Sequence, residues 1–160
     1  MDLRLVAIID SAVLNGRDAV PVALAAQAGG ATALQIRMKG ASAADTYDAT
    51  RRLLAQVTIP VYVNDRADVA WATGAQGVHL GQDDVPARAL RPFLPSGFRI
   101  GLSVGSPTEA HTELTSNADY WSIGPLYRTA SKTDAGVPLG PQGFSMLAFR
   151  PAWASWTPAP

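Results

Sequence analysis

Residues 33–39 read Ala-Leu-Gln-Ile-Arg-Met-Lys, so apolar and polar side chains alternate strictly from Leu34 to Lys39. Successive side chains of a β-strand point to opposite faces, and one face would therefore carry Gln35, Arg37 and Lys39. Helix-like stretches on both sides of the run predict a parallel strand that is buried on both faces. Two cations on a buried face are costly unless an anion meets them, and a phosphate or diphosphate group would do so.

The composition limits the classes of protein to which the chain can belong. Its 160 residues are 48% hydrophobic and 16% charged, which is typical of a globular domain with one core. Acidic and basic residues number 13 each, so no net charge draws the chain to nucleic acid or to a membrane surface. The absence of cysteine excludes disulfides and thiolate chemistry. We recognise no signal peptide and no membrane-spanning run, and cytoplasm is the expected location.

Strand-like runs alternate with helix-like runs along the chain. We expect strands at 3–9, 33–39, 61–64, 77–80, 99–104 and 120–124. We expect helices at 18–28, 42–56, 66–73, 86–94 and 107–115, with Ser42 and Ser106 as N-caps. This alternation predicts βα units, a parallel sheet and right-handed crossovers.

Two architectures surround a parallel sheet with helices: the open doubly wound sheet and the (β/α)8 barrel. A dinucleotide-binding open sheet needs a glycine-rich turn after its first strand, but residues 10–13 are Asp-Ser-Ala-Val. A barrel gathers functional groups at the carboxyl ends of many strands, and polar residues follow five successive strands here. The sequence therefore predicts an α/β fold of the TIM (β/α)8-barrel type. Such barrels use roughly 200–250 residues, so we expect an incomplete barrel of about six βα units.

Carboxylates at two of these strand ends form a candidate metal site. Asp65 follows the third expected strand and Asp84 follows the fourth, and a barrel would bring both to the same mouth. Two carboxylates that face a diphosphate suit Mg²⁺, which prefers oxygen ligands and shares them with substrate phosphates. Alternatively, Asp65 caps the next helix and Asp84 merely precedes Pro86. The basic face at 33–39 favours the metal.

A polar loop at 124–132 and a serine on the fifth strand are candidate phosphate contacts. Thr129, Ser131 and Lys132 offer hydroxyls and a cation within one short loop, a combination that also occurs on ordinary surfaces. Ser103 either contacts a ligand or bonds to a neighbouring carbonyl. We expect His79, a lone histidine on a strand, to be structural.

Six motifs, in order along the chain, resemble the thiamine-phosphate synthase family. They lie at 35–39, 63–66, 77–84, 101–103, 118–120 and 124–132. The resemblance covers roughly residues 3–143, and the family's last two strands have no counterpart, so the chain looks like a C-terminally truncated member. We therefore expect a barrel domain at 1–143 and an irregular tail at 144–160.

The resemblance implies a (β/α)8 barrel that joins hydroxymethylpyrimidine diphosphate to hydroxyethylthiazole phosphate, with Mg²⁺, and releases thiamine phosphate and diphosphate. It assigns the pyrimidine diphosphate to Gln35, Ile36, Arg37, Met38, Lys39, Asn64, Ser103 and Lys132. It assigns Mg²⁺ to Asp65 and Asp84, and the thiazole phosphate to Thr129, Ala130 and Ser131. Arg37, Lys39 and Lys132 would be catalytic because they would stabilise the departing diphosphate. Met38 stands where the family usually has glutamate.

Two other functions stay open at this point. The chain could be a truncated, inactive relative that binds phosphate ligands at most. It also resembles the thiazole tautomerase-like proteins, although these carry a histidine after the fifth strand, where this chain has Gly105. Phosphorylated pyrimidine and thiazole substrates are the expected partners, with no nucleic acid and no membrane. The sequence leaves open whether the chain forms a homo-oligomer.

Overall fold

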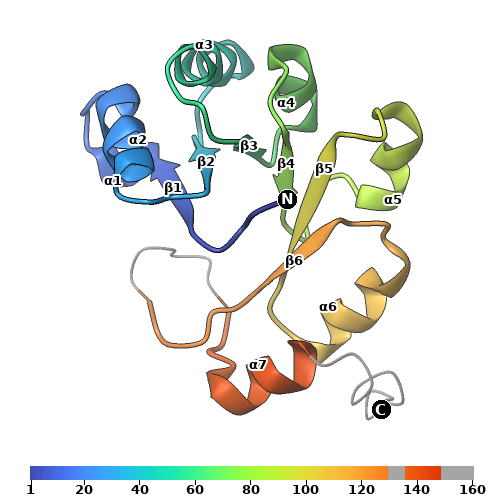
Figure 1. The fold of residues 1–160 in the computed structure, drawn as a ribbon. Helices are drawn as coiled ribbons and strands as arrows, with labels where there is room; N and C mark the ends of the chain where they lie inside the picture. The colour runs from blue at the N-terminus through green and yellow to red at the C-terminus, as the bar shows by residue number, and fades with distance from the viewer. Residues whose placement is uncertain (130–135, 149–160) are drawn as a thin grey trace. The chain divides into compact units, whose positions relative to one another are not determined.

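The computed structural model describes residues 1–129 and 136–148 as parallel strands that alternate with helices (Figure 1). The strands are β1 (Val6–Asp10), β2 (Ala33–Arg37), β3 (Val61–Asn64), β4 (Gly77–Leu80), β5 (Arg99–Val104) and β6 (Tyr120–Ile123). Their order in the sheet is β1-β2-β3-β4-β5-β6, so each strand neighbours the next one in sequence. That order belongs to a (β/α)8-type barrel and not to a doubly wound sheet. The predicted fold class, with six strands, is confirmed.

Helical segments follow the strands, as expected for βα units. They are α1 (Ser11–Leu14), α2 (Ala19–Ala28), α3 (Ala43–Leu54), α4 (Ala67–Thr73), α5 (Ala87–Leu90), η1 (Arg91–Phe93), α6 (Pro107–Thr112), η2 (Glu113–Thr115) and α7 (Gly140–Ala148). In Figure 1, α2, α3 and α4 lie side by side, and α3 packs against both of the others. Over the described residues, no helix combines the length and apolarity that a bilayer crossing requires.

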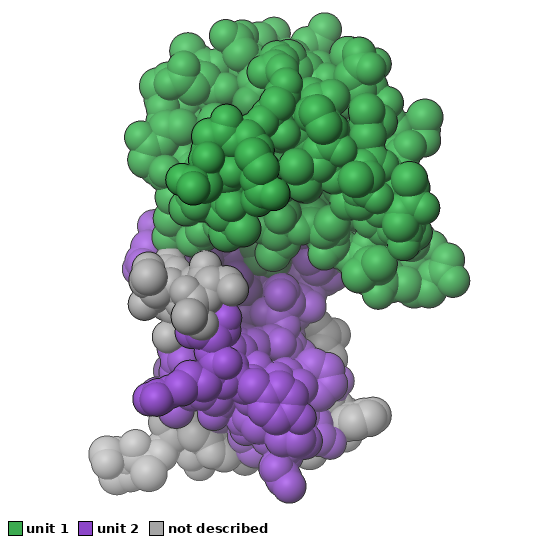
Figure 2. All heavy atoms as spheres, turned by 90° about the vertical axis from the view of Figure 1, so that its left-hand side faces the viewer, with its two compact units in different colours: residues 1–79, 94–100 green, residues 80–93, 101–160 purple. Residues whose placement is uncertain are grey.

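The chain divides into two compact units, which Figure 2 shows in different colours. Unit 1 contains Met1–His79 and Leu94–Ile100, and its buried side chains include Leu34, Tyr62 and Val63. Unit 2 contains Leu80–Phe93 and Gly101–Pro160. Its core cluster consists of Val104, Ala110 and Leu147, against which Leu114, Trp121, Ile123 and Leu139 pack.

Both predicted serine N-caps are confirmed. The hydroxyl of Ser42 accepts a hydrogen bond from the Asp45 N–H at 3.0 Å, and that of Ser106 accepts one from the Glu109 N–H at 3.2 Å. The Glu109 carboxylate in turn accepts the Gly105 N–H at 2.7 Å. These two bonds satisfy one backbone donor in the first turn of α6 and the donor of Gly105, which directly precedes the cap.

Several expected boundaries differ from those of the structure, among them the start of the first strand, which is Val6 and not residue 3. Two of the differences have identifiable reasons. β2 ends at Arg37 and not at Lys39, because the chain turns there: the Ala41 N–H bonds to the Met38 carbonyl at 3.1 Å, and Gly40 adopts a φ of 81°. The expected irregular tail begins inside α7, whose Leu147 is buried in the core of unit 2. A proline in the first turn of a helix is tolerated, which is why Pro141 does not prevent α7. Residues 149–160 lie outside the described residues.

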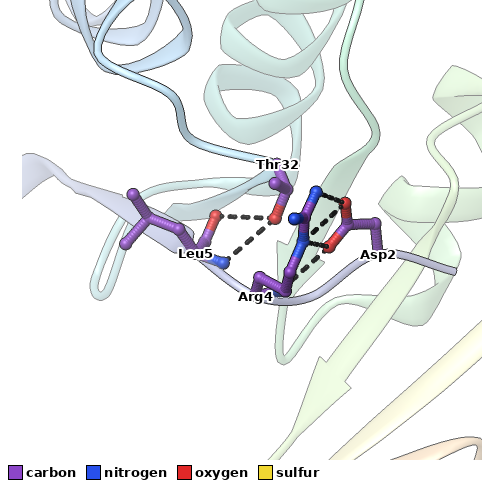
Figure 3. Close-up of polar contacts among 4 residues, drawn as sticks. All are labelled: Asp2, Arg4, Leu5 and Thr32. Atoms are coloured by element: carbon purple, nitrogen blue, oxygen red, sulfur yellow. Dashed lines mark hydrogen bonds and ion pairs between the residues drawn. The ribbon is translucent and has the colours of Figure 1, made fainter.

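The segment before β1 is tied to the start of β2 by one threonine (Figure 3). The Thr32 hydroxyl accepts the Leu5 N–H at 3.0 Å and donates to the Leu5 carbonyl at 3.1 Å. Nearby, the exposed Arg4 guanidinium donates to both carboxylate oxygens of Asp2. The bonds of Thr32 therefore hold Leu5 in place just before the strand, which begins at Val6.

The Asp2–Arg4 pair gives the first testable prediction. Hydrogen bonds from the Arg4 side chain and backbone lower the pKa of Asp2 from 3.8 to about 2. Arg4→Ala should therefore raise this pKa towards 3.8 in an NMR titration. A carboxyl group with a lowered pKa stabilises the fold above its unfolded pKa and loses that effect as the pH falls through its folded pKa. Because the pair is solvated, this contribution is small, and the melting temperature at pH 7 should fall only slightly in the variant. An unchanged Asp2 pKa in the variant would contradict this account.

Candidate functional site

A buried ion pair lies at the carboxyl ends of β1 and β2. Asp10 and Arg37 are the last residues of these strands and face each other in the register. Arg37 Nη1 donates to Asp10 Oδ2 at 2.5 Å, and the two side chains are only 13% and 10% exposed. Arg37 is therefore largely, although not fully, buried. The sequence predicts that a phosphate compensates the positive charge of Arg37. In the structure, the carboxylate of Asp10 compensates part of that charge.

Asp10 is the site residue that the sequence analysis missed. It ends the first strand, whereas the predicted polar residues all lie on or follow later strands. The usable signal was an acidic residue at the end of one strand beside a basic residue at the end of the next. Opposite charges on adjacent strands attract when the register places them together. The register does so here.

Gln35 shares the face of Arg37, as predicted. It lies two residues earlier on the same strand, opposite Ile8 of β1 and Tyr62 of β3, and is 6% exposed. Alternation along β2 therefore places a buried amide next to a buried guanidinium. An amide and a guanidinium are both donors to phosphate oxygens.

Ile36 and Met38 lie elsewhere. Both line a cavity of about 460 Å³ in unit 1, together with Ile9 and residues of α1, α2 and α3. Neither Gln35 nor Arg37 belongs to that lining. The side chains of Ile36 and Met38 therefore do not lie with those of Gln35 and Arg37, although all four were expected to contact the same substrate.

Lys39 differs from the prediction as well. The strand has ended before it, and Lys39 lies exposed in the turn at 38–41. The sequence pattern overestimated the length of the strand because alternation continues into the turn. The contact of Lys39 with a diphosphate stays a prediction.

Asp65 is held in an unusual backbone conformation after β3. Its φ is 64°, its N–H donates to the His79 carbonyl at 2.8 Å, and Asn64 pairs with His79 in the register. Left-handed conformations are uncommon outside glycine and gather at functional sites. The alternative role as a helix cap is wrong, because α4 has Arg66 at its N-cap position and no side-chain cap. His79 is buried, as expected of a structural residue.

In unit 2, two polar contacts organise the loop after β4. Asp84 Oδ2 accepts the Gly81 N–H at 2.7 Å, and Gln82 Nε2 donates to the Ser103 carbonyl at 2.7 Å. Ser103 is half-buried on β5 and lies opposite Ser122 of β6. The loop thus presents a half-buried carboxylate whose orientation is fixed by a backbone donor.

The remaining predicted residues lie on or beyond the loop after β6. Thr129 is exposed. Ala130, Ser131 and Lys132 lie outside the described residues. Asp65 belongs to unit 1 and Asp84 to unit 2, and their pairing stays a prediction. Within the described ranges, three or more acidic, histidine or cysteine side chains do not gather as a metal site. A Mg²⁺ ion that shares carboxylates with substrate phosphates does not require such a group.

Parallel strands in sequence order that alternate with helices, with polar groups at the strand ends, define the barrel class of folds, whose enzymes act at the carboxyl ends of the strands. Residues 5–150 match the family described as "Thiamine monophosphate synthase", and the chain belongs to this family. The match reaches beyond residue 143, where the resemblance was expected to stop.

Named relatives support the assignment. The chain is 42% identical over 144 residues to a thiamine-phosphate synthase of Methanospirillum hungatei, covering 88% of this chain and 70% of the relative. It is 42% identical over 138 residues to the thiamine-phosphate synthase of Anaeromyxobacter dehalogenans, covering 85% of this chain and 61% of that relative. A solved thiamine phosphate pyrophosphorylase from Pyrococcus furiosus superposes with a TM-score of 0.73 at 31% identity, covering 89% of this chain and 68% of the other. The relatives are transferases, and the predicted enzyme class is confirmed.

Proposed function

We propose that this chain joins hydroxymethylpyrimidine diphosphate to hydroxyethylthiazole phosphate and releases thiamine phosphate and diphosphate. The observation that carries the proposal is the Arg37 guanidinium, buried at the carboxyl end of β2 beside Gln35. Barrel enzymes act at this end of the strands. A desolvated guanidinium there suits a ligand with several anionic oxygens.

The proposed reaction needs no nucleophile from the protein. The bond between the pyrimidine methylene carbon and a diphosphate oxygen breaks, and the bonding electrons leave with the diphosphate. The thiazole nitrogen then forms the new carbon–nitrogen bond with its lone pair. Arg37 stabilises the negative charge on the departing group, with Lys39 and Lys132 as the other proposed cations. Fixed charges aimed at developing charge, and placement of the two substrates, supply the rate enhancement.

Mg²⁺ is the proposed cofactor, and the donor chemistry fits it. Asp65 and Asp84 provide hard carboxylate oxygens, which Mg²⁺ prefers to nitrogen or sulfur. One oxygen of Asp84 accepts the Gly81 N–H, which fixes the direction of its other oxygen. When bound, the ion would neutralise diphosphate charge. We propose that Asn64 and Ser103 orient the pyrimidine diphosphate, and that Thr129, Ala130 and Ser131 meet the thiazole phosphate.

The test is a coupling assay with both substrates and Mg²⁺, run beside calorimetry with the pyrimidine diphosphate alone. Turnover to thiamine phosphate is the expected result. Binding without turnover would favour an inactive relative that retains only phosphate binding. Conversion of a thiazole substrate without coupling would favour the tautomerase-like function. Because both proposed substrates carry phosphate groups that do not cross bilayers unaided, we place the reaction in the cytoplasm.

The acidic pair gives a second prediction. Asp84→Asn keeps an oxygen for the Gly81 N–H but removes one negative charge from the proposed Mg²⁺ site. The Mg²⁺ concentration for half-maximal activity should rise at least tenfold. The matched control is Asp83→Asn, which changes the same charge at the exposed neighbouring residue and should leave this concentration unchanged. Equal Mg²⁺ dependence of the wild type and both variants would remove Asp84 from the metal site.

A further inference from the structure

We propose that Asp10 is a positioning residue, which aims the Arg37 guanidinium at the departing diphosphate. This inference rests on the proposed function and adds a role that the sequence motifs do not contain. Asp10 does not contact substrate in this proposal. It acts through Arg37, to which it is joined at 2.5 Å.

Both carboxylate oxygens of Asp10 are engaged. Oδ1 accepts the Ala12 N–H at 2.9 Å, at the start of α1, and Oδ2 accepts Arg37 Nη1. The backbone therefore fixes the carboxylate, and the carboxylate fixes the guanidinium. A guanidinium is a planar fork of five N–H donors, so a held Nη1 restricts the directions in which the other donors can point.

Burial makes this direction useful for the reaction. The side chains of Asp10 and Arg37 are both about nine-tenths buried, so water screens the pair weakly. A cation that is already oriented stabilises negative charge without reorganising when the charge develops. A buried ion pair is poor evidence of a purely stabilising role, because apolar replacements of similar volume are often as stable. Its place at the catalytic end of two strands favours orientation.

The same unit holds a matched pair that is exposed. Asp18 caps α2 by accepting the Val20 N–H at 3.1 Å and also accepts Arg52 Nη2 at 2.7 Å. Asp18 thus makes the same two kinds of contact as Asp10. The side chains of this pair are exposed, however, with 62% for Arg52 and 47% for Asp18. Asp18→Asn is therefore the control for loss of a capping carboxylate with an arginine partner.

The experiment compares Asp10→Asn with Asp18→Asn in the full chain. Asparagine keeps an oxygen for the Ala12 N–H but releases Arg37 from its charged partner. For Asp10→Asn we expect kcat of the coupling reaction to fall at least tenfold, while KM for the pyrimidine diphosphate changes less than threefold. Binding of inorganic diphosphate with Mg²⁺, measured by calorimetry, should be retained, because the site has lost a competing negative charge. Asp18→Asn should retain the wild-type kcat and KM.

Other outcomes overturn the inference. An unchanged kcat in folded Asp10→Asn would show that Arg37 does not need Asp10 to position it. Turnover by the wild-type chain would then still support the proposed function. If the asparagine variant does not fold, Asp10→Ser, which can also accept the Ala12 N–H, replaces it. Failure of both variants to fold would make Asp10 a stability residue and reject the positioning role. A wild-type chain without turnover would reject the proposed function, and this inference with it.

Discussion

Gly77→Ala is expected to lower the free energy of unfolding by roughly 3 kcal/mol, at the upper end of the usual cost of overpacking a core. A Cβ atom at Gly77 would lie 2.1 Å from the carbonyl oxygen of Arg99 and 2.8 Å from its carbonyl carbon. Both are backbone atoms, so they cannot rotate away as a side chain would. The start of β5 would have to separate from β4. Urea denaturation monitored by circular dichroism measures the loss.

The control for this substitution is Gly97→Ala in the same unit. A Cβ atom there meets nothing within 4 Å, and its φ does not require glycine. Its free energy of unfolding should stay within about 0.5 kcal/mol of the wild-type value. A Gly77→Ala variant as stable as Gly97→Ala would show that β4 and β5 do not approach as closely as described.

Arg37→Ala is expected both to lower turnover strongly and to destabilise the fold. The substitution leaves the Asp10 carboxylate buried without this partner, and breaking a buried pair in this way costs roughly 3–5 kcal/mol. Loss of one donor to developing charge lowers kcat by about 10²–10³-fold in other enzymes. We expect a loss of kcat/KM of at least 10²-fold for the coupling reaction, on the same grounds. Activity is measured at a temperature where circular dichroism shows the variant to be folded.

Two further variants separate the stability effect from the functional one. Arg52→Ala removes an exposed arginine that is also paired with an aspartate, and should cost at most about 1 kcal/mol with no loss of turnover. The double variant Asp10→Asn/Arg37→Ala removes both charges of the buried pair and should recover much of the stability lost by Arg37→Ala alone. Its activity should stay low. Recovered activity in the double variant would show that Arg37 serves the fold only.

Local sequence signals explain which parts of the fold could be predicted. Strands β3, β4 and β5 begin and end at the predicted residues, because each is a short, mostly apolar run that is followed directly by aspartate or glycine. The serine caps followed from side-chain chemistry at single positions. Helix α1 is only 4 residues long, too short to show any helical period, and was missed.

Contacts between distant residues explain what the sequence left out. The Asp10–Arg37 pair joins residues 27 positions apart, and only the register of β1 against β2 brings them together. Strand β2 ends where the chain turns at Gly40, but the alternation of apolar and polar residues continues to Lys39 and gives no sign of this turn. Helix α7 depended on tertiary packing, because Leu147 reaches the core of unit 2 with Val104 and Ala110. Pattern reasoning found the basic strand end but not the carboxylate beside it.

The central claim is that Arg37 binds the diphosphate of a substrate. Calorimetric titration of inorganic diphosphate with Mg²⁺ tests it most directly, using the wild-type chain, Arg37→Ala and the exposed control Arg52→Ala. We predict that the wild type and Arg52→Ala bind with the same affinity, and that folded Arg37→Ala binds at least 10²-fold more weakly, since it loses charge-assisted hydrogen bonds. Equal affinity of all three proteins would contradict the account.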